Sequence, residues 1–139
     1  MMNRVLIVGS LLLGMSMLTL DVNAGEAAPI AGAKAVPLLT KALPDIAGKE
    51  GVMLTVEYPP GVASASHRHN ANTFVYVLEG SVVMQVAGGP EQTLTVGQTF
   101  HELPTDIHTV SRNASTSKPA KILVFMVKEQ GAPITVPAG

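Results

Sequence analysis

Short stretches of β-forming residues, separated by glycine and proline, set the strongest limit on how this chain can fold. Residues 52–58 (VMLTVEY) alternate apolar and polar positions and are rich in β-branched side chains, which is typical of a strand. Similar stretches follow at short spacing, and no segment has the periodicity of an amphipathic helix. The pattern predicts an all-β domain, either a sandwich or a barrel. The further predicted strands are residues 74–78, 81–86, 92–96, 99–102, 108–111 and 120–128.

Two details of this pattern concern the pairing of strands. Glu79 and Gly80 separate residues 74–78 from residues 81–86, and such a short connection predicts a tight β-hairpin. Residues 120–128 form the longest β-type run, so we expect this strand to lie at the centre of a sheet. Residues 36–43 could be a short strand or a strap across a barrel.

The composition limits both the core and the partners. The 139 residues suffice for one domain with a proper core. The chain has three Phe, two Tyr and no Trp, so Val, Leu, Ile and Met must build that core. A net charge of −1, without basic runs, gives no electrostatic basis for binding nucleic acid or an anionic membrane surface. We therefore expect a small-molecule partner.

Residues 1–24 are typical of a secretory signal peptide. A short positive start contains Arg4, and residues 5–20 form an uncharged apolar run. Val22 and Ala24 suit the positions before a cleavage site. The apolar run is shorter than the ~20 residues that a membrane-spanning helix needs. We therefore expect a periplasmic or secreted protein that does not stay in the membrane.

Cleavage after residue 24 would leave a flexible lead, residues 25–35, and one folded domain, residues 36–136. The chain has no cysteine, which excludes both a lipid-modified cysteine anchor and disulfide bonds. The fold must therefore be stabilised by its core, with help from a dimer interface and a bound metal.

His67 and His69 are the first candidate functional residues. Residues at i and i+2 of an extended segment point to the same face, so the two imidazoles should lie side by side. His108 follows in a second stretch interrupted by glycine and proline. Neutral imidazole nitrogens bind first-row divalent metals well, and three of them leave coordination positions open for a small ligand. The alternative is that these histidines line an empty pocket.

These residues resemble the two motifs of the cupin superfamily. Gly61, His67, His69 and Gly80 fall on the spacing of the first motif. In the second motif Gly97 and His108 are in place, whereas Leu103 and Thr105 stand where Pro and Gly are usual, and Asn113 comes one residue late. The resemblance is to small, single-domain cupins. It implies a jelly-roll β-barrel in which the three histidines face one interior point as metal ligands.

The first cupin motif normally carries a metal-binding Glu that this chain lacks. Thr73 stands in its place, or Phe74 on the alternative spacing, and neither can supply a charge. An all-nitrogen site favours an anionic or chelating substrate, and it favours Zn, Cu, Ni or Fe over Mn. We expect Zn or Cu in the cell envelope. Glu102 is the candidate replacement, as a fourth metal ligand or as a catalytic proton acceptor, and His101 should point to the opposite face.

Three functions remain open at this point. The first is a metal-dependent, dioxygenase-like oxidoreductase acting on a small chelating substrate. The second is a non-catalytic module that binds a small ligand or metal. The third is a metal-assisted isomerase, decarboxylase or hydrolase, for which Glu102 would serve as the general base. We also expect a homodimer in which residues 36–58 pack or exchange across the interface, because exposed edge strands can pair with a second copy.

Overall fold

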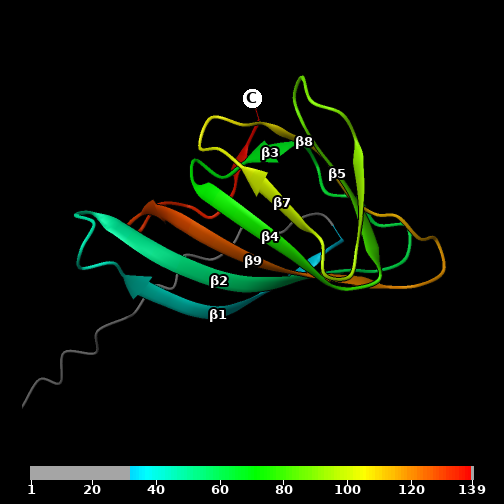
Figure 1. Cartoon of the computed structure of the whole chain (residues 1–139), viewed down its shortest axis with the longest axis horizontal. Helices are drawn as coiled ribbons and strands as arrows, with labels where there is room; N and C mark the ends of the chain where they lie inside the picture. The colour runs from blue at the N-terminus through cyan, green and yellow to red at the C-terminus, as the bar shows by residue number, and fades with distance from the viewer. Residues whose placement is uncertain (1–31, 139) are drawn as a thin grey trace, which may run out of the picture.

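The computed structural model describes residues 32–138, which form two antiparallel β-sheets of five strands each (Figure 1). The first sheet has the order β1-β2-β9-β4-β7 and the second the order β10-β3-β8-β5-β6. The strands of the first sheet are β1 (Lys34–Ala42), β2 (Lys49–Tyr58), β9 (Ala120–Glu129), β4 (Asn72–Glu79) and β7 (Thr99–Glu102). Those of the second are β10 (Val136–Pro137), β3 (His67–Arg68), β8 (His108–Asn113), β5 (Ser81–Val86) and β6 (Gln92–Thr95).

The predicted all-β jelly-roll barrel is confirmed. Each predicted strand is present, and the uncertain segment 36–43 belongs to β1, which begins at Lys34. The predicted signal peptide and residues 25–31 of the predicted lead lie outside the described residues. Residues 32–138 contain no helix with the length and apolar character needed to cross a membrane.

Strand β9 lies at the centre of the first sheet, as its length and apolar content predicted. It pairs with β2 on one side and with β4 on the other. Its side chains alternate strictly between the interior and the outer face. This alternation fixes the register, because a slip of one residue would expose the whole buried set.

The predicted hairpin at Glu79 and Gly80 is wrong. Strand β4 pairs with β7 and β9, whereas β5 pairs with β6 and β8, so the chain passes at Gly80 from one sheet to the other. Gly80 has a φ of 68°, and an added Cβ would lie 2.4 Å from the carbonyl oxygen of Pro119. Glycine is required here, but it suits a corner between sheets as well as a hairpin. The pairing is decided by the neighbouring strands, which local sequence does not reveal.

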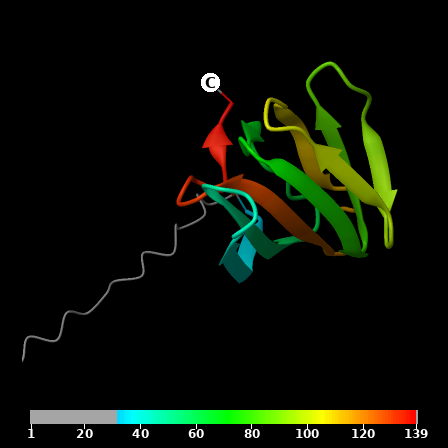
Figure 2. The same cartoon turned by 60° about the vertical axis from the view of Figure 1, so that its left-hand side comes forward.

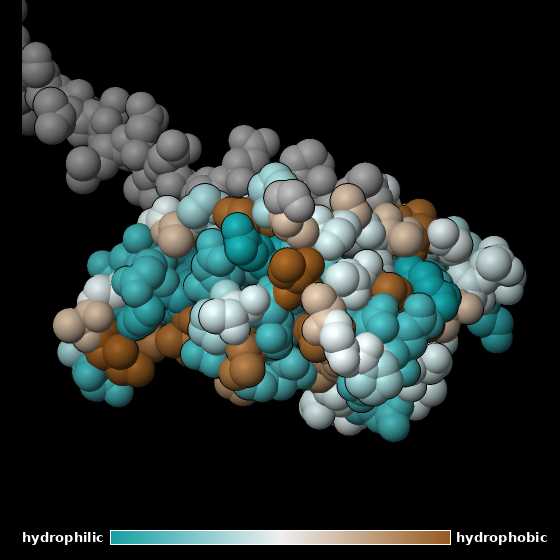
Figure 3. Space-filling model, turned by 90° about the horizontal axis from the view of Figure 1, so that it is seen from above, coloured by the Kyte–Doolittle hydropathy of each residue, from teal (hydrophilic) through white to brown (hydrophobic). Residues whose placement is uncertain are grey.

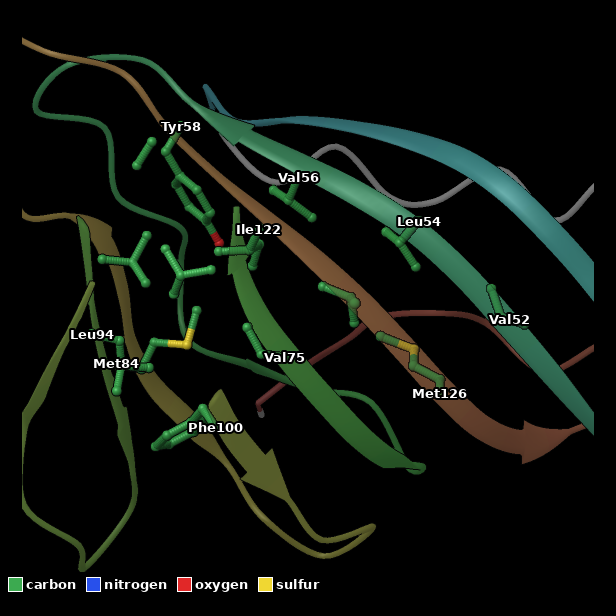
Figure 4. Packing of buried hydrophobic residues seen from close by; sticks show 14 of the residues in the cluster. Val52, Leu54, Val56, Tyr58, Val75, Met84, Leu94, Phe100, Ile122 and Met126 are labelled. Carbon is green, nitrogen blue, oxygen red and sulfur yellow. The ribbon is translucent and has the colours of Figure 1, made fainter. Parts of the chain in front are cut away.

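The core lies between the two sheets and consists mainly of aliphatic side chains. Alternate residues of β2 enter it, and Figure 4 shows them turned toward the side chains of the facing strands. Full burial of each large apolar side chain stabilises the fold by about 1.5–3 kcal/mol. The largest apolar contributors are Leu54, Tyr58, Met84, Leu94, Phe100, Ile122 and Met126.

The C-terminal segment folds back along the second sheet, where β10 pairs with β3 (Figure 2). A buried lysine anchors this segment. The Nζ of Lys128 donates hydrogen bonds to the Glu50 carboxylate and to the carbonyl oxygens of Glu129 and Ala132. The extended segment predicted at His67 and His69 is β3, which ends at Arg68, whereas β10 was not predicted; each strand spans only two residues.

The outer face of the first sheet carries exposed apolar side chains. On β4, Val75 and Val77 are buried, whereas Phe74, Tyr76 and Leu78 are 41–46% exposed. Phe74 stacks on His101 of β7, with ring centroids 4.8 Å apart.

Seen from above, the surface of the molecule is mostly hydrophilic, with small separate apolar patches (Figure 3).

Candidate metal site

The structure brings the three predicted histidines together inside the barrel. His67 on β3 lies directly opposite His108 on β8, so the two side chains share one face of the second sheet. His69 follows two residues after His67 and points the same way. One ring nitrogen from each of the three lies within 4.8 Å of those of the other two. His67 and His108 are buried and His69 is nearly so.

Backbone carbonyls fix two of the three rings. The Nδ1 of His67 hydrogen-bonds to the Ala65 carbonyl oxygen at 2.8 Å, and the Nδ1 of His69 to the Ile134 carbonyl oxygen at 2.7 Å. A carbonyl only accepts, so Nδ1 must carry the proton in both rings. In each neutral ring the lone pair of Nε2 is then free to bind a metal.

Burial keeps all three histidines neutral. It lowers the pKa of His67, and it lowers the pKa of His69 to about 4. The pKa of His108 falls to about 3, first through burial and then through the neighbouring His67 and His69. Neither ring nitrogen of His108 has a hydrogen-bond partner, although both are buried. Buried nitrogens without partners are costly unless a ligand satisfies them, and a metal ion does so.

Glu102 lies beside these rings, as predicted. It is 2% exposed, and its Oε1 and Oε2 lie 3.4 Å from His108 Nδ1 and 3.8 Å from His69 Nε2. His101, the preceding residue, is exposed on the opposite face. Burial, with a smaller contribution from the charge of Asp106, raises the pKa of Glu102 to about 8. Without a metal, therefore, Glu102 is mostly protonated at neutral pH.

Thr73 lies directly opposite Glu102, on β4. Its side chain is fully buried, and its Oγ1 has no hydrogen-bond partner. Both residues line the same interior cavity as the three histidines. The position at which the first cupin motif carries Glu is therefore inside the site, with a hydroxyl in place of the carboxylate.

The cavity has a volume of about 30 Å³, which is room for about two water molecules. Away from the histidines its walls are mainly apolar. A hydroxyl pair also faces it, in which Tyr58 Oη and Ser111 Oγ are 2.6 Å apart. The apolar lining residues are Ala35, Leu54, Val56, Val75, Met84, Ile122, Val124, Met126 and Ile134.

Sequence reasoning did not assign Tyr58, Ser111 or Ile134 to this cavity. Tyr58 carried a signal, because its hydroxyl follows Val52, Leu54 and Val56 on the apolar face of β2. Ser111 carried none, and Ile134 enters only because the C-terminal segment folds back over the site.

Several residues of the two motifs have structural rather than chemical roles. The Nδ2 of Asn113 donates to the carbonyl oxygens of Tyr58 and Lys118, which ties the end of β8 to the end of β2 and to the loop before β9. Asn70 adopts a φ of 50°, in the left-handed region that Asn tolerates, and turns the chain from β3 toward β4. Arg68 is exposed and faces away from the histidines, as expected from the alternation.

Comparison with protein families gives one match, to the family described as Cupin domain, over residues 54–126. That range contains the three histidines, Glu102 and Thr73, and leaves out Ala35 and the C-terminal wall of the cavity. No curated protein matches the chain.

Solved structures with the same fold include proteins of several kinds. An uncharacterized conserved protein with a double-stranded β-helix domain from Klebsiella pneumoniae has a TM-score of 0.60 at 21% identity, over 81% of this chain and 90% of its own. An oxalate oxidase in complex with the substrate analogue glycolate has a TM-score of 0.60 at 20% identity, over 81% of this chain and 60% of its own. The DMSP lyase DddQ from Ruegeria pomeroyi has a TM-score of 0.56 at 20% identity, over 63% of this chain. This chain spans only 43% of that lyase's length, and at such identities the likeness shows the fold alone.

Proposed function

The chain belongs to the cupin domain family, and we propose that it is a metal-dependent oxidoreductase of the dioxygenase kind that acts on a small substrate. The observation that carries the proposal is the convergence of three buried, neutral imidazoles beside a buried carboxyl group. Burying three imidazoles and a carboxyl group together is costly when no ligand satisfies their polar atoms. A divalent metal bound there would supply Lewis acidity and open positions for a small anionic ligand.

The donor set fits a divalent transition metal. His67 and His69 would bind through Nε2, since Nδ1 of each is held by a carbonyl. His108 would provide the third nitrogen, and the ring of Phe100 stacks against it with centroids 5.9 Å apart. Glu102 can serve in two ways. It can complete the ligand set through Oε2, or it can accept a hydrogen bond from His108 Nδ1 and so orient that ring.

Glu102 is also the group best placed to move a proton. It lies in the cavity with its pKa raised to about 8, close to the operating pH that suits a general acid or base. The apolar walls around it limit the access of water. The hydroxyls of Tyr58 and Ser111 are engaged with each other.

Elemental analysis and oxygen uptake together test this function. The purified protein, loaded in turn with Fe(II) and Cu(II), is offered small carboxylates, catechols and diketones while dissolved oxygen is recorded. Oxygen uptake that is lost in His69→Ala supports the proposal. Metal binding without oxygen uptake by any candidate would favour the metal-assisted isomerase, decarboxylase or hydrolase, or the non-catalytic module.

The metal found in the native protein separates these functions further. Three nitrogens without a motif carboxylate favour Cu and Zn over Fe and Mn. We propose that the protein acquires Zn or Cu in the cell envelope. Zn has no redox chemistry, so a zinc protein would contradict the oxidoreductase and favour metal-assisted isomerase, decarboxylase or hydrolase chemistry.

We also propose that residues 1–24 are removed and that the protein works in the periplasm or outside the cell. The support is the order of a positive start, an apolar run and small residues before Gly25. Mass spectrometry of the protein expressed with its own leader tests this proposal. A mature chain that begins at Gly25 is expected, and an intact N-terminus in the cell envelope would contradict it.

A homodimer remains our proposal for the assembly. Support comes from β1 at the edge of the first sheet and from the exposed Phe74 and Tyr76 on the outer face of that sheet. Sedimentation at micromolar concentration should give a dimer, and Phe74→Ser with Tyr76→Ser should shift it toward monomer. A monomeric wild-type protein would contradict the proposal.

A further inference from the structure

We propose that the hydroxyl group of Thr73 donates a hydrogen bond to a compact oxyanion, such as a short carboxylate, held at the three-histidine site. This inference rests on the proposed metal binding and names the substrate class of that site. It assigns to Thr73 a role in recognising the ligand, not in binding the metal.

The first observation is the state of the hydroxyl itself. Thr73 is fully buried, its Oγ1 lacks a hydrogen-bond partner, and the residue lines the cavity. An unsatisfied buried hydroxyl destabilises a fold, so its presence here points to a partner that arrives with the ligand. The neighbouring Val75 and Val77, which share its face of β4, show that an apolar residue fits this face of the strand.

The second observation is the charge of the surroundings. An imidazole that binds a metal does so in its neutral form, and no lysine or arginine of residues 32–138 lines the cavity. A divalent ion held by three neutral nitrogens keeps its full charge, and it still carries one net positive charge if Glu102 joins the ligand set, so in either case it favours an anionic ligand. An anion in this cavity can be stabilised by a hydroxyl donor, and Thr73 offers one that is not otherwise engaged.

The third observation is the size of the cavity. The space beside the histidines, about 30 Å³ or about two water molecules, suits formate or the head of acetate and leaves no room at that point for an aromatic ring. The apolar walls opposite the histidines suit at most a short alkyl group. Together, size and charge select a small oxyanion.

The test compares the full-length wild type with Thr73→Val and Thr73→Ser. Each is loaded with Co(II), cobalt content is measured, and formate is titrated while the visible cobalt spectrum is recorded. Wild type and Thr73→Ser should bind formate alike. Thr73→Val should keep its cobalt and bind formate roughly tenfold more weakly, the usual effect of losing one hydrogen bond to a charged group. Benzoate should leave the wild-type spectrum unchanged.

Thr55→Val is the matched control. Thr55 is also buried, but it lies on the outward-facing side of β2 in the same sheet and does not line the cavity. Its valine variant should bind formate like wild type. Thr73→Ala provides the same loss of the hydroxyl if Thr73→Val does not fold.

The outcomes separate this inference from the proposed function. If Thr73→Val or Thr73→Ala retains cobalt and binds formate as tightly as wild type, the role of Thr73 is wrong while the metal site stands. If benzoate binds as tightly as formate, the substrate class is wrong. If the wild type takes up no cobalt, the proposed metal site itself fails, and this inference fails with it.

Discussion

Thr73 and Glu102 lie directly opposite each other on β4 and β7, with both side chains buried in the same cavity. Thr73 occupies the position at which the cupin motif carries a carboxylate, and Glu102 supplies a carboxyl group from the adjacent strand. Residues directly opposite on antiparallel strands have Cβ atoms ~5 Å apart, so the displacement is small. The site thus keeps an acidic group near the histidines, but it approaches them from another direction.

Replacing His69 with alanine should remove most of the bound metal and lower the melting temperature. His69 is one of three nitrogen donors, and the ion would tie the segment after β3 to β8. Elemental analysis and thermal unfolding measure both effects.

His101→Ala is the matched control, because His101 is exposed on the outer face and stacks on Phe74. It should keep the metal content of wild type. If His69→Ala kept full metal content and an unchanged melting temperature, the empty pocket would be the better description of this site.

Glu102 should lower the stability of the metal-free protein progressively as the pH rises from about 4.5 to 8, and Glu102→Gln should remove this contribution. Burial raises the pKa of Glu102 to about 8 in the folded state from an ordinary value of 4.5. Between these values the unfolded chain has released the proton and the folded chain still holds it, so rising pH favours unfolding.

Urea unfolding in the presence of a chelator, at pH 5 and at pH 8, measures this difference. The free energies of unfolding of the wild type and of Glu102→Gln should differ more at pH 8 than at pH 5. From pH 5 to pH 8 the variant should become more stable relative to the wild type. The histidines act in the opposite sense, because their lowered pKa values cost stability as the pH falls below 6.5. A difference between the two proteins that does not depend on pH would contradict the burial of an ionisable Glu102.

Asn113→Ala should destabilise the fold without changing metal content. Its amide group donates to the buried carbonyl oxygen of Tyr58 and to the partly buried one of Lys118, and the substitution leaves both acceptors without this donor. The expected cost is about 1–3 kcal/mol in the free energy of unfolding. Metal content that falls along with stability would instead place Asn113 among the residues that support the site.

Lys128→Met should lower the free energy of unfolding by about 3 kcal/mol, the typical cost of removing one partner from a buried ion pair. The Lys128 side chain is 3% exposed and holds Glu50 together with two carbonyl oxygens of the C-terminal segment. The double variant Lys128→Met with Glu50→Gln should recover part of the loss, because the unpaired carboxylate is gone. Equal stability of the single and double variants would show that the carboxylate does not matter.

The strands could be predicted from the sequence because alternation is a local property. Residues 99–102 illustrate this, since they predicted β7 with its exact bounds and placed Glu102 and His101 on opposite faces. Pairing is not local. Gly80 marks a change of direction, but only β9 and β7, which come later in the chain, decide that β4 and β5 belong to different sheets.

The candidate site could be predicted only as far as its residue types carry a signal. The histidines carry a signal because His67 and His69 are spaced to share one face, and Glu102 carries one because it lies on the strand that leads into His108. The Ile134 carbonyl that orients His69 could not be found, since any residue offers a carbonyl. The free hydroxyl of Thr73 and the small cavity depend on packing between the sheets.

The metal content of the protein recovered from the cell envelope tests the central claim most directly. The full chain, expressed with its own leader and purified without added metal or chelator, is analysed for transition metals alongside His69→Ala and His101→Ala. The metal-site claim predicts about one ion of Zn or Cu per chain in the wild type and in His101→Ala, and little in His69→Ala. Cu would also agree with the oxidoreductase, whereas Zn would support the metal site and contradict the oxidoreductase. A wild-type protein that carries no metal, or no more metal than His69→Ala carries, would contradict the metal-site claim.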